Sequence, residues 1–385
     1  MPVPLRHARI AIAGAGPGGL TLARILQLKG IHTTVFEREE MPTSRPQGGS
    51  LDMHEDTGQF AIAQAGLTDA FQMIARYDDQ DFRIYDKVGT LRASRPGSSA
   101  DNRPEVDRGQ LRQMLLESLP PSTIRWHRGL LAIEQQQNGG VDVIFQSGAR
   151  ASFDLVVGAD GTWSRVRPWL SEAKPIYSGV TLYELGIPDA DLQHPELAQI
   201  VGRGLMFAVG DSKTIGGHRD ANAHLGIYAG MRVEESVIRS LTEESRQQLK
   251  PTLLAQFADW APNLLRLIAD ASSTVVPRPI YALPTCHRWE HRRGVTIIGD
   301  AAHVMSPFGG DGANLAMRDA ADLALALTEN EDWEVAVRGF ELEMCQRAEQ
   351  SAAAANQAIQ DVFSENGLNH MLETFEQIHG QDHSS

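Results

Sequence analysis

Long apolar runs are missing from this sequence, and their absence argues against an integral membrane protein. The longest apolar stretches are interrupted by Gly, Asp or Arg, and all fall short of the roughly 20 residues that a membrane span requires. The first begins at Ile10 and leads into glycines instead of a small-residue cleavage site, so we expect no secretory signal. The sequence therefore predicts a soluble protein.

Cysteine and positive charge are scarce as well. The chain has two cysteines, Cys286 and Cys345, and 385 residues can bury a core without a disulfide, so we expect free thiols in a reducing cytoplasm. The 35 Lys and Arg residues stand against 49 Asp and Glu, a net charge of −14 that repels polyphosphate and anionic lipid. We therefore expect neither nucleic acid nor a membrane surface as a partner. No His, Cys, Asp or Glu residues recur at metal-ligand spacing, which predicts no metal site.

A glycine-rich motif follows the first strand-like run. Gly14, Gly16 and Gly19 have the G-x-G-x-x-G spacing, and an amphipathic helical pattern follows them. Glycines at such a turn let backbone N–H groups approach a pyrophosphate at the positive end of a helix. Glu37 ends the next predicted strand, where a carboxylate can hydrogen-bond the ribose hydroxyls of an adenosine. The pattern predicts a dinucleotide site, although it does not distinguish FAD from NAD.

Two later motifs bear on that choice. A buried-strand pattern ends in Asp160-Gly161, and a second one ends in Gly299-Asp300. A glycine-rich loop over residues 307–314 then leads into a helical pattern. Each motif alone is compatible with an ordinary turn at the end of a strand. All three in this order favour FAD.

The ordered motifs resemble those of the class A flavoprotein monooxygenases of the para-hydroxybenzoate hydroxylase fold, and the resemblance covers about residues 9–330. It implies FAD as the cofactor, NADPH or NADH as the electron donor, and O2 and a small ring-containing molecule as the substrates. In that family NAD(P)H reduces the flavin, O2 adds to flavin C4a, and the resulting hydroperoxide transfers oxygen to an electron-rich carbon. The protein's part is to exclude water and place the substrate.

The resemblance also implies cofactor contacts. Asp300 would hold the ribityl chain and pyrophosphate region, Arg108 would reach the same cofactor, and the Asp160-Gly161 motif is associated with both FAD and NAD(P)H. The expected cofactor-binding residues are Gly14, Gly16, Gly19, Glu37, Arg38, Arg45, Asp52, Arg108, Asp160, Gly161, Asp300, Gly310, Gly312, Ala313 and Asn314. We assign no catalytic residue.

Within this class, residues 48–54 are similar to a segment of the tetracycline-inactivating monooxygenases. That similarity implies that Asp52 contacts FAD and that Arg45 takes part in NADPH binding. It also matches Arg203 and His224 to the arginine and histidine that bind the antibiotic. A surface arginine and a satisfied strand histidine are the alternative interpretations of those two residues.

The chain also departs from the tetracycline enzymes. Glu184 stands where they have a glutamine, so a carboxylate would face the polar edge of the substrate, and Asp311 stands where many relatives have Gln. The expected substrate-binding residues are Glu184, Arg203, His224, Pro307, Phe308 and Gly309. Tetracycline-type antibiotics are the leading substrates, and a different phenol or polyketide is the alternative.

The fold class expected is α/β. Hydrophobic residues make up 42% of the chain and charged residues 22%, a globular composition, and the length favours two domains. Strand-like stretches around residues 82–85 and 224–228 suggest a mostly antiparallel inserted sheet. We expect a Rossmann-like FAD-binding domain over 1–74, 101–174 and 276–330, a substrate-binding domain over 75–100 and 175–275, and a long C-terminal helix over 331–378.

Hydroxylation of a phenolic or enolic ring by a cytoplasmic monomer or weak homodimer is thus the predicted function. An FAD-dependent reductase that inserts no oxygen is the main alternative. A flavin-dependent halogenase is less favoured because its W-x-W-x-I-P segment is absent, and an NAD enzyme because of the Gly299-Asp300 motif. A protein that binds FAD or a drug without turnover would show ligand binding with no substrate-dependent NADPH oxidation.

Overall fold

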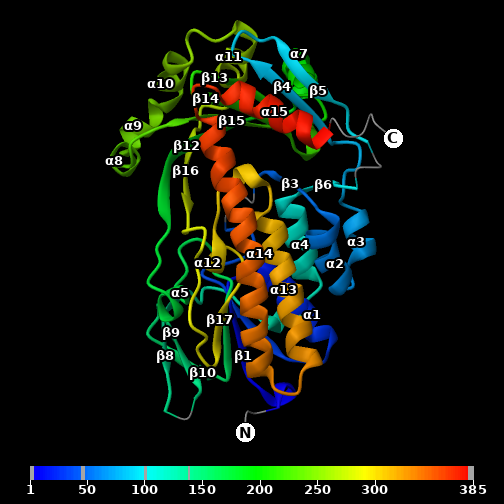
Figure 1. The fold of residues 1–385 in the computed structure, drawn as a ribbon, viewed down its shortest axis with the longest axis vertical. Helices are drawn as coiled ribbons and strands as arrows, with labels where there is room; N and C mark the ends of the chain where they lie inside the picture. The colour runs from blue at the N-terminus through cyan, green and yellow to red at the C-terminus, as the bar shows by residue number, and fades with distance from the viewer. Residues whose placement is uncertain (1–3, 45–47, 99–101, 138, 380–385) are drawn as a thin grey trace. The chain divides into compact units, whose positions relative to one another are not determined.

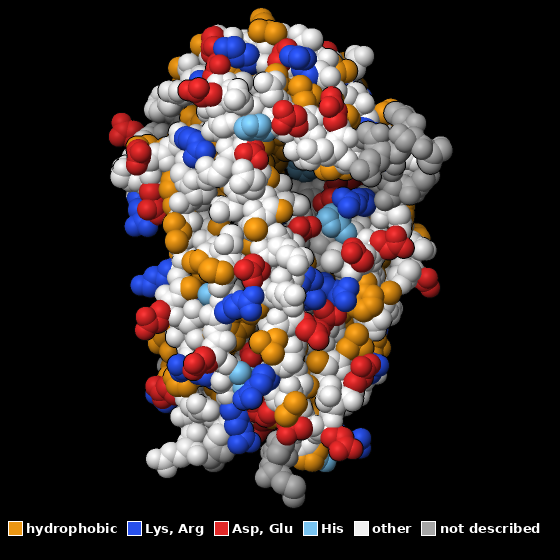
Figure 2. All heavy atoms as spheres, in the orientation of Figure 1, with side chains coloured by type: hydrophobic (Ala, Val, Ile, Leu, Met, Phe, Trp, Pro, Cys, Tyr) orange, Lys and Arg blue, Asp and Glu red, His pale blue; other side chains and the backbone are white. Residues whose placement is uncertain are grey.

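The computed structural model describes residues 4–44, 48–98, 102–137 and 139–379, which form two compact units. The first unit comprises Met1–Ala75, Arg108–Ile176 and Tyr281–Asn356, and the second comprises Arg76–Asp107, Tyr177–Ile280 and Gln357–Ser385. None of the helices in these described ranges combines the length and the apolar composition that a membrane span needs. Figure 2 shows basic side chains lying among acidic ones on the pictured face, without an extended basic patch.

A five-stranded parallel sheet forms the centre of the first unit, in the order β17-β11-β1-β2-β7 (Figure 1). Its strands are β1 (Ile10–Ala13), β2 (Thr33–Phe36), β7 (Ile124–Arg125), β11 (Leu155–Gly158) and β17 (Val295–Ile297). The strands β1, β11 and β17 are buried along their whole length. That burial explains why they are continuous apolar runs without alternation, since both faces of a parallel sheet are covered.

Helices and a second, antiparallel sheet complete the first unit. The helices are α1 (Pro17–Leu28), α2 (Phe60–Gln64), α3 (Thr68–Gln72), α4 (Arg108–Glu117), α5 (Arg167–Leu170), α12 (Asp300–His303), α13 (Gly312–Glu329) and most of α14 (Trp333–Val362). The antiparallel sheet has the order β10-β9-β8, with β8 (Leu130–Gln135), β9 (Val141–Phe145) and β10 (Arg150–Phe153). Short elements are β3 (Ser50–Asp52), the π-helical turn η2 (Glu55–Gln59) and the 3-10 turn η6 (Pro307–Gly309).

Helices α1 and α13 pack closely because of a glycine. A Cβ atom on Gly18 would lie 2.8 Å from the carbonyl oxygen of Ala316, closer than real Cβ contacts allow. Gly299 meets the same residue, since a Cβ there would lie 2.7 Å from the Cβ of Ala316. The two glycines therefore let helix α1 and the turn after β17 approach α13 at the same residue.

The second unit is built on a seven-stranded, mostly antiparallel sheet in the order β16-β12-β15-β14-β13-β4-β5. Its strands are β4 (Asp81–Asp86), β5 (Leu91–Arg95), β12 (Ile176–Ile187), β13 (Gly204–Gly210), β14 (Lys213–Arg219), β15 (Leu225–Arg232) and β16 (Val276–Ala282). Strands β4 and β13 run parallel to each other. The predicted α/β class, with a Rossmann-like domain and an antiparallel substrate domain, is confirmed by this arrangement.

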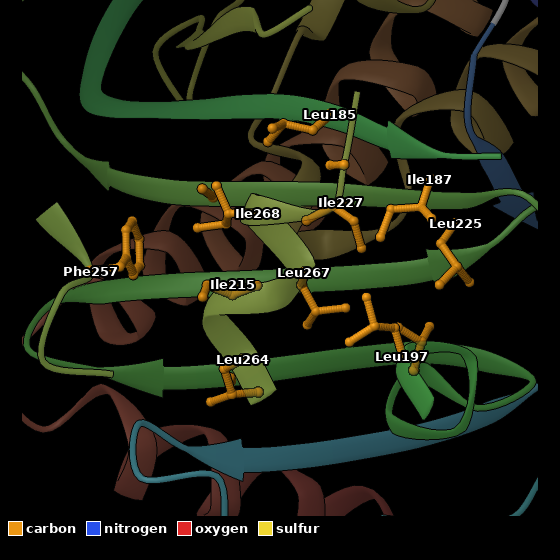
Figure 3. Packing of buried hydrophobic residues seen from close by; sticks show 14 of the residues in the cluster. Leu185, Ile187, Leu197, Ile215, Leu225, Ile227, Phe257, Leu264, Leu267 and Ile268 are labelled. Carbon is orange, nitrogen blue, oxygen red and sulfur yellow. The ribbon is translucent and has the colours of Figure 1, made fainter. Parts of the chain in front are cut away.

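One face of this sheet is covered by helices that the sequence analysis did not predict. They are α6 (Ala190–Gln193), α7 (Pro195–Val201), α10 (Leu249–Gln256) and α11 (Pro262–Ala269), with Ile238 of α8 (Glu235–Arg239) packed against the same core. Helix α9 (Glu243–Gln247), also not predicted, holds none of the described residues of this core. Figure 3 shows Leu264, Leu267 and Ile268 of α11 lying over the strand residues Ile215 and Ile227. Alternation along each strand directs these apolar side chains to the helices, so the neighbouring positions point to the opposite face.

The C-terminal segment is helical, as expected, and forms α14 followed by α15 (Gly367–His379). A Cβ atom on Gly367 would overlap the carbonyl oxygen of Val362, the last residue of α14, so the close turn between the helices requires glycine. Within the second unit, Phe375 of α15 stacks on Phe82 of β4 with ring centroids 6.0 Å apart. The C-terminal helix thus packs on a strand of that unit.

We expect Leu267→Ala to lower the free energy of unfolding by about 2–5 kcal/mol, because the side chain is completely buried in α11 and its removal leaves a cavity. Leu192→Ala is the matched control, since Leu192 is 85% exposed in the same unit and its loss should change stability by no more than about 0.5 kcal/mol. Urea denaturation followed by circular dichroism measures both. Equal stability of the two variants would contradict the packing described for α11.

Candidate functional site

The glycine-rich loop after β1 has a conformation that only glycine permits at two positions. Gly14 has φ of +105°, and a Cβ atom there would overlap the carbonyl oxygen of Ala159. A Cβ atom on Gly19 would overlap the carbonyl oxygen of Gly14. These two predicted cofactor residues therefore fold the loop tightly against the end of β11.

Gly16 has a different role, because it faces open space. No heavy atom lies within 4 Å of the position of a Cβ on this residue. It is the N-cap of α1, no side chain caps the helix, and Pro17 occupies the first turn. Uncapped N–H groups and the helix dipole make such an end a binding place for an anionic group. The loop thus fits a pyrophosphate in front of Gly16.

Glu37 lies at the end of β2 and is buried. Its Oε2 accepts a hydrogen bond from the Ala15 backbone N–H (2.8 Å) and its Oε1 accepts one from Glu39 N–H (3.0 Å). A carboxylate offers about four acceptor positions, so Glu37 retains capacity for ribose hydroxyls while it fixes the loop.

Arg112 in α4 reinforces the same loop, and the sequence analysis did not assign it a role. Its buried guanidinium donates to the carbonyl oxygens of Ala15 (3.2 Å) and Pro42 (2.9 Å) and pairs with Glu39 (2.8 Å). Arg108, the predicted arginine four residues earlier, is exposed, and its backbone N–H bonds the Gly49 carbonyl (3.1 Å). The signal for Arg112 was its one-turn spacing from Arg108.

Two further basic residues, Arg38 and Arg45, belong to the predicted set. Arg38 follows Glu37 and its side chain is exposed. Arg45 lies outside the described residues, so its predicted part in NADPH binding stays a prediction.

The loop after β11 contains a buried acceptor without a partner. Asp160 Oδ2 accepts the Arg165 N–H (2.7 Å), while its buried Oδ1 has no hydrogen-bond partner among the residues that the structure describes. Burial raises the pKa of the Asp160 carboxyl. Gly161 has φ of +79° and open space around its Cα. An unpartnered buried oxygen is costly, so this acceptor fits a ligand that donates a hydrogen bond.

Asp300 is the first residue of α12 and is exposed, with Oδ2 3.3 Å from the Thr162 hydroxyl. Below it, the buried Arg167 guanidinium donates to the carbonyl oxygens of Thr162 (2.6 Å), Ala301 (3.0 Å) and Asp300 (3.4 Å). Arg167 therefore joins the loops after β11 and β17, and it was not among the predicted residues.

A buried carboxylate supports the second of these loops. Asp319 in α13 accepts hydrogen bonds from the Gly299 N–H (3.0 Å) and from Arg347 of α14 (2.9 Å), and its Oδ2 lies 2.6 Å from Nε2 of His303. Burial opposes ionisation of Asp319, but the His303 and Arg347 charges outweigh it and lower its pKa. This network holds α12, α13 and α14 together around the Asp300 turn.

The loop before α13 combines open glycines with one fully used side chain. Gly310 has φ of +74°, and Gly312 has no heavy atom near its Cβ position. Ala313 is the next residue of the helix. The buried Asn314 amide accepts from His54 N–H (3.0 Å) and donates to the Asp52 carbonyl (2.8 Å). The Asn314 side chain thus ties the start of α13 to β3.

Asp52 is the predicted FAD contact of β3. Its Oδ2 lies 2.8 Å from Nε2 of His54, whose Nδ1 lies 3.6 Å from Asp311 Oδ1. The His54 imidazole thus stands between two carboxylates beside the start of α13. The sequence analysis quoted His54 within the segment 48–54 but gave it no role.

Pro307, Phe308 and Gly309 form the turn η6, also in the first unit. The Ser306 hydroxyl accepts the Phe308 N–H (3.3 Å) and so shapes the turn. A Cβ atom on Gly309 would lie 2.9 Å from the Cβ of Ala355, so this glycine fits closely against α14.

The other three predicted substrate residues lie in the second unit. Glu184 in β12 pairs with Nε of Arg278 in β16 at 2.7 Å. His224 precedes β15, and its Nδ1 lies 2.9 Å from Asp220 Oδ2. Glu184 acts on His224 electrostatically, because its charge contributes to the raised pKa of that imidazole. The structure therefore brings these two predicted residues near each other.

Arg203 belongs to a different set of contacts. Its side chain is 64% exposed, and its Nε lies 3.2 Å from Asp79, with Nη2 4.0 Å from Asp78. Both the surface-arginine interpretation and the substrate-binding one are compatible with this position.

One cluster of described side chains has ligand atoms close enough to share a cation. It consists of His194, Glu196 and Asp270, and Arg266 pairs with both carboxylates, at 2.5 Å and 2.7 Å. The arginine already balances their charge, so the cluster is a surface ion-pair network. That the chain holds no metal stays a prediction.

Comparison with known proteins gives a consistent result. A family model described as "FAD binding domain" matches residues 7–334. The monooxygenase asqM of Emericella nidulans is 33% identical over 82% of this chain and 83% of its own length. The FAD-dependent urate hydroxylase of Klebsiella pneumoniae subsp. pneumoniae is 26% identical over 87% of this chain and 85% of its own.

Solved structures share the fold. The Klebsiella pneumoniae protein HpxO, complexed with FAD and uric acid, superposes with a TM-score of 0.81 at 23% identity, covering 97% of this chain and 92% of that one. The tetracycline destructase Tet(55) gives a TM-score of 0.73 at 20% identity, covering 93% and 90%. At such identities the likeness concerns the fold alone. The predicted similarity to the tetracycline enzymes is thus supported for the fold, whereas the two sequence relatives described above are a monooxygenase and a urate hydroxylase.

Gly16→Ala and Gly18→Ala separate binding from folding. Gly16 has extended backbone angles and open space, so Gly16→Ala should leave the melting temperature of the FAD-free protein unchanged and weaken FAD binding about tenfold or more, that is about 1.4 kcal/mol. Gly18→Ala forces a methyl group against Ala316 and should lower the stability of the FAD-free protein by about 1–3 kcal/mol. Calorimetry and fluorescence titration with FAD measure these effects. If Gly16→Ala binds FAD as tightly as wild type, the pyrophosphate does not lie in front of that residue.

Proposed function

Because the chain belongs to the FAD-binding-domain family of flavin-dependent monooxygenases, we propose that it uses NADPH or NADH and O2 to hydroxylate a ring-containing phenolic or enolic molecule. The observation that carries the proposal is the convergence of three loops of the first unit, those that follow β1, β11 and β17. The first loop has an open glycine and an uncapped helix start, the second has an unpartnered carboxylate oxygen, and the third has an exposed carboxylate. Groups of these kinds bind the phosphates and hydroxyls of a dinucleotide. When bound, FAD accepts a hydride from the nicotinamide and activates O2.

The residues of the first unit that would hold FAD have separate tasks. Gly16 and the start of α1 would bind the pyrophosphate, and the free acceptor positions of Glu37 would take the adenosine ribose hydroxyls. Asp300 would accept hydrogen bonds from hydroxyl groups of the ribityl chain. The start of α13, after Gly312, would direct its N–H groups and positive dipole end toward the pyrimidine edge of the flavin, which is negatively charged when reduced.

The second unit would bind the substrate on the sheet face opposite helices α7, α10 and α11, beside the part of that face on which α15 packs. His224 and the Glu184–Arg278 pair offer that face a hydrogen-bond donor and a charged pair. Such groups recognise ring oxygens that exist as keto, enol or phenol forms. Relatives named for urate and for 3-amino-4-hydroxybenzoate carry hydroxylated or keto-enol rings in their substrates, which supports this substrate class. A tetracycline-type antibiotic is one member of the class, and another phenol or polyketide is the alternative.

Asp300→Ala should weaken FAD binding by about 1.5–3 kcal/mol, because it removes a charged acceptor for cofactor hydroxyls. Its exposed side chain makes one long contact to Thr162, so the substitution should not lower the stability of the FAD-free protein. Asp69→Ala, an exposed aspartate of α3, is the matched control and should leave the Kd for FAD unchanged. Equal flavin retention by both variants after gel filtration would refute the role of Asp300.

The activity test uses purified, FAD-loaded protein with tetracycline, uric acid and a panel of simple phenols. Oxidation of NADPH and of NADH, oxygen uptake and product mass under 18O2 are followed together. We expect substrate-dependent oxidation and one labelled oxygen atom in a product. Oxidation without labelled product would identify a reductase, and binding of a ring compound without oxidation would identify a binding protein. Either result would overturn the proposal.

A further inference from the structure

Two imidazoles share one carboxylate at the end of the β14–β15 hairpin. Nε2 of His218, in β14, lies 2.6 Å from Oδ1 of Asp220, and Nδ1 of His224 lies 2.9 Å from Oδ2 of the same residue. Asp220 and His218 are each only 14% exposed, whereas the His224 side chain is 40% exposed. The three residues therefore run from a covered imidazole through a covered carboxylate to an accessible imidazole.

Glycines make the space for both rings. A Cβ atom on Gly226 would lie 2.6 Å from the His218 imidazole, and one on Gly186 would lie 2.5 Å from Nε2 of His224. Positions 186, 218 and 226 point away from the apolar core, because the neighbouring strand positions carry the core side chains. Nε2 of His224 is thus held over the strand β12, on the face that is not packed against α11.

The turn that joins the two strands is built to present these groups. Ala223 and Asn222 have φ of +53° and +58°, a region that residues other than glycine seldom occupy. The Asp220 N–H donates to the His224 carbonyl (2.9 Å), and the Ala221 N–H donates to Asp107 Oδ1 (3.3 Å). Such backbone conformations are unfavourable and persist where the surroundings fix them.

The negative charges near His224 favour its protonated form. The hydrogen bond to Asp220 raises the pKa of His224, burial opposes the rise, and the charges of Asp220, Glu184 and Asp107 add to it. Glu184 is itself paired with Arg278, and Asp107 with Arg76 at 2.5 Å, so neither carboxylate acts at full strength. Burial opposes ionisation of Asp220, but its contacts with His218 and His224 outweigh it and lower its pKa.

We propose that Asp220 is a positioning residue that holds His224 as an imidazolium, with Nε2–H presented to the sheet face opposite α11, and that His218 in turn positions Asp220. Asp220 accepts a hydrogen bond from Nδ1–H of His224, which fixes the ring and leaves Nε2–H to donate to a ligand. His218 holds the carboxylate in place from its other side.

The task of this imidazolium rests on the proposed function. A phenol or enol becomes electron-rich at carbon when its O–H proton has gone to solvent, and a fixed N–H⁺ donor stabilises the oxyanion that remains. The proton on His224 is not consumed in this scheme, so the residue binds and polarises and is not a general base. Binding of the anion is lost as the pH rises through the raised pKa of His224, because the imidazole then becomes neutral.

The deciding experiment is an NMR titration of imidazole signals in the FAD-loaded protein, with His224 assigned by its loss in His224→Gln. In wild type we expect His224 to titrate above the ordinary histidine value of about 6.5. Asp220→Asn should lower that pKa by about one unit, a tenfold change in the acid dissociation constant. His218→Asn should raise the pKa of His224, because His218 then no longer competes with His224 for the Asp220 carboxylate.

Two further variants give the controls. Asp211 lies in the turn between β13 and β14, at the opposite end of the β14–β15 hairpin from His224. Asp211→Asn should therefore leave the His224 signal unchanged. Asp220→Glu keeps the charge and should retain a raised pKa, which a merely structural role of Asp220 would not require. Flavin content and melting temperature show that each variant is folded.

Failure of this inference is distinguishable from failure of the proposed function. A wild-type His224 that titrates at or below about 6.5, or one whose pKa is the same in Asp220→Asn, overturns the inference whether or not the protein is active. The wild-type titration decides even if Asp220→Asn does not fold. A protein with the expected titration that oxidises NADPH with none of the tested ring compounds would overturn the proposed function alone.

Discussion

The first unit depends on one fully buried carboxylate. Asp319 gathers a backbone N–H from the turn after β17, an imidazole from α12 and a guanidinium from α14. Removing one partner of a buried charged pair typically costs about 3–5 kcal/mol, because the remaining charge is left without compensation. The exposed Asp300 and the helix start beside it are therefore held in place by a network of largely buried side chains.

Two buried arginines extend this support to the other loops. Arg167 joins the carbonyl oxygens of the turns after β11 and β17, and Arg112 joins the glycine-rich loop to the chain after β2. Each guanidinium has several fixed donors, so one side chain can bind carbonyl groups of segments far apart in the sequence. The three loops after β1, β11 and β17 are thus held by the buried side chains of Arg112 and Arg167.

The sequence predicted what depends on local spacing and missed what depends on distant partners. The G-x-G-x-x-G loop, the strand-end aspartates and the sheet-rich second unit follow from patterns within a few residues. The roles of Arg167 and Asp319 do not, because Arg167 bonds Ala301, which is 134 positions away, and Asp319 bonds Gly299 and Arg347. The short helices α6, α7, α8 and α10 were missed because each carries only a few apolar positions and needs the sheet beneath it to be stable. Helix α11 was missed although Leu264, Leu267 and Ile268 recur at helical spacing.

Gly186 and Gly226 leave room for the imidazoles of His224 and His218, because neither glycine has a side chain. A methyl group at either position would displace a ring while leaving every charged group of the turn in the chain. The chemistry of that face is therefore adjustable by volume as well as by charge. During evolution, one added carbon on a neighbouring strand could displace an imidazole, and its loss could restore the ring. A substitution that looks conservative in polarity would then change specificity.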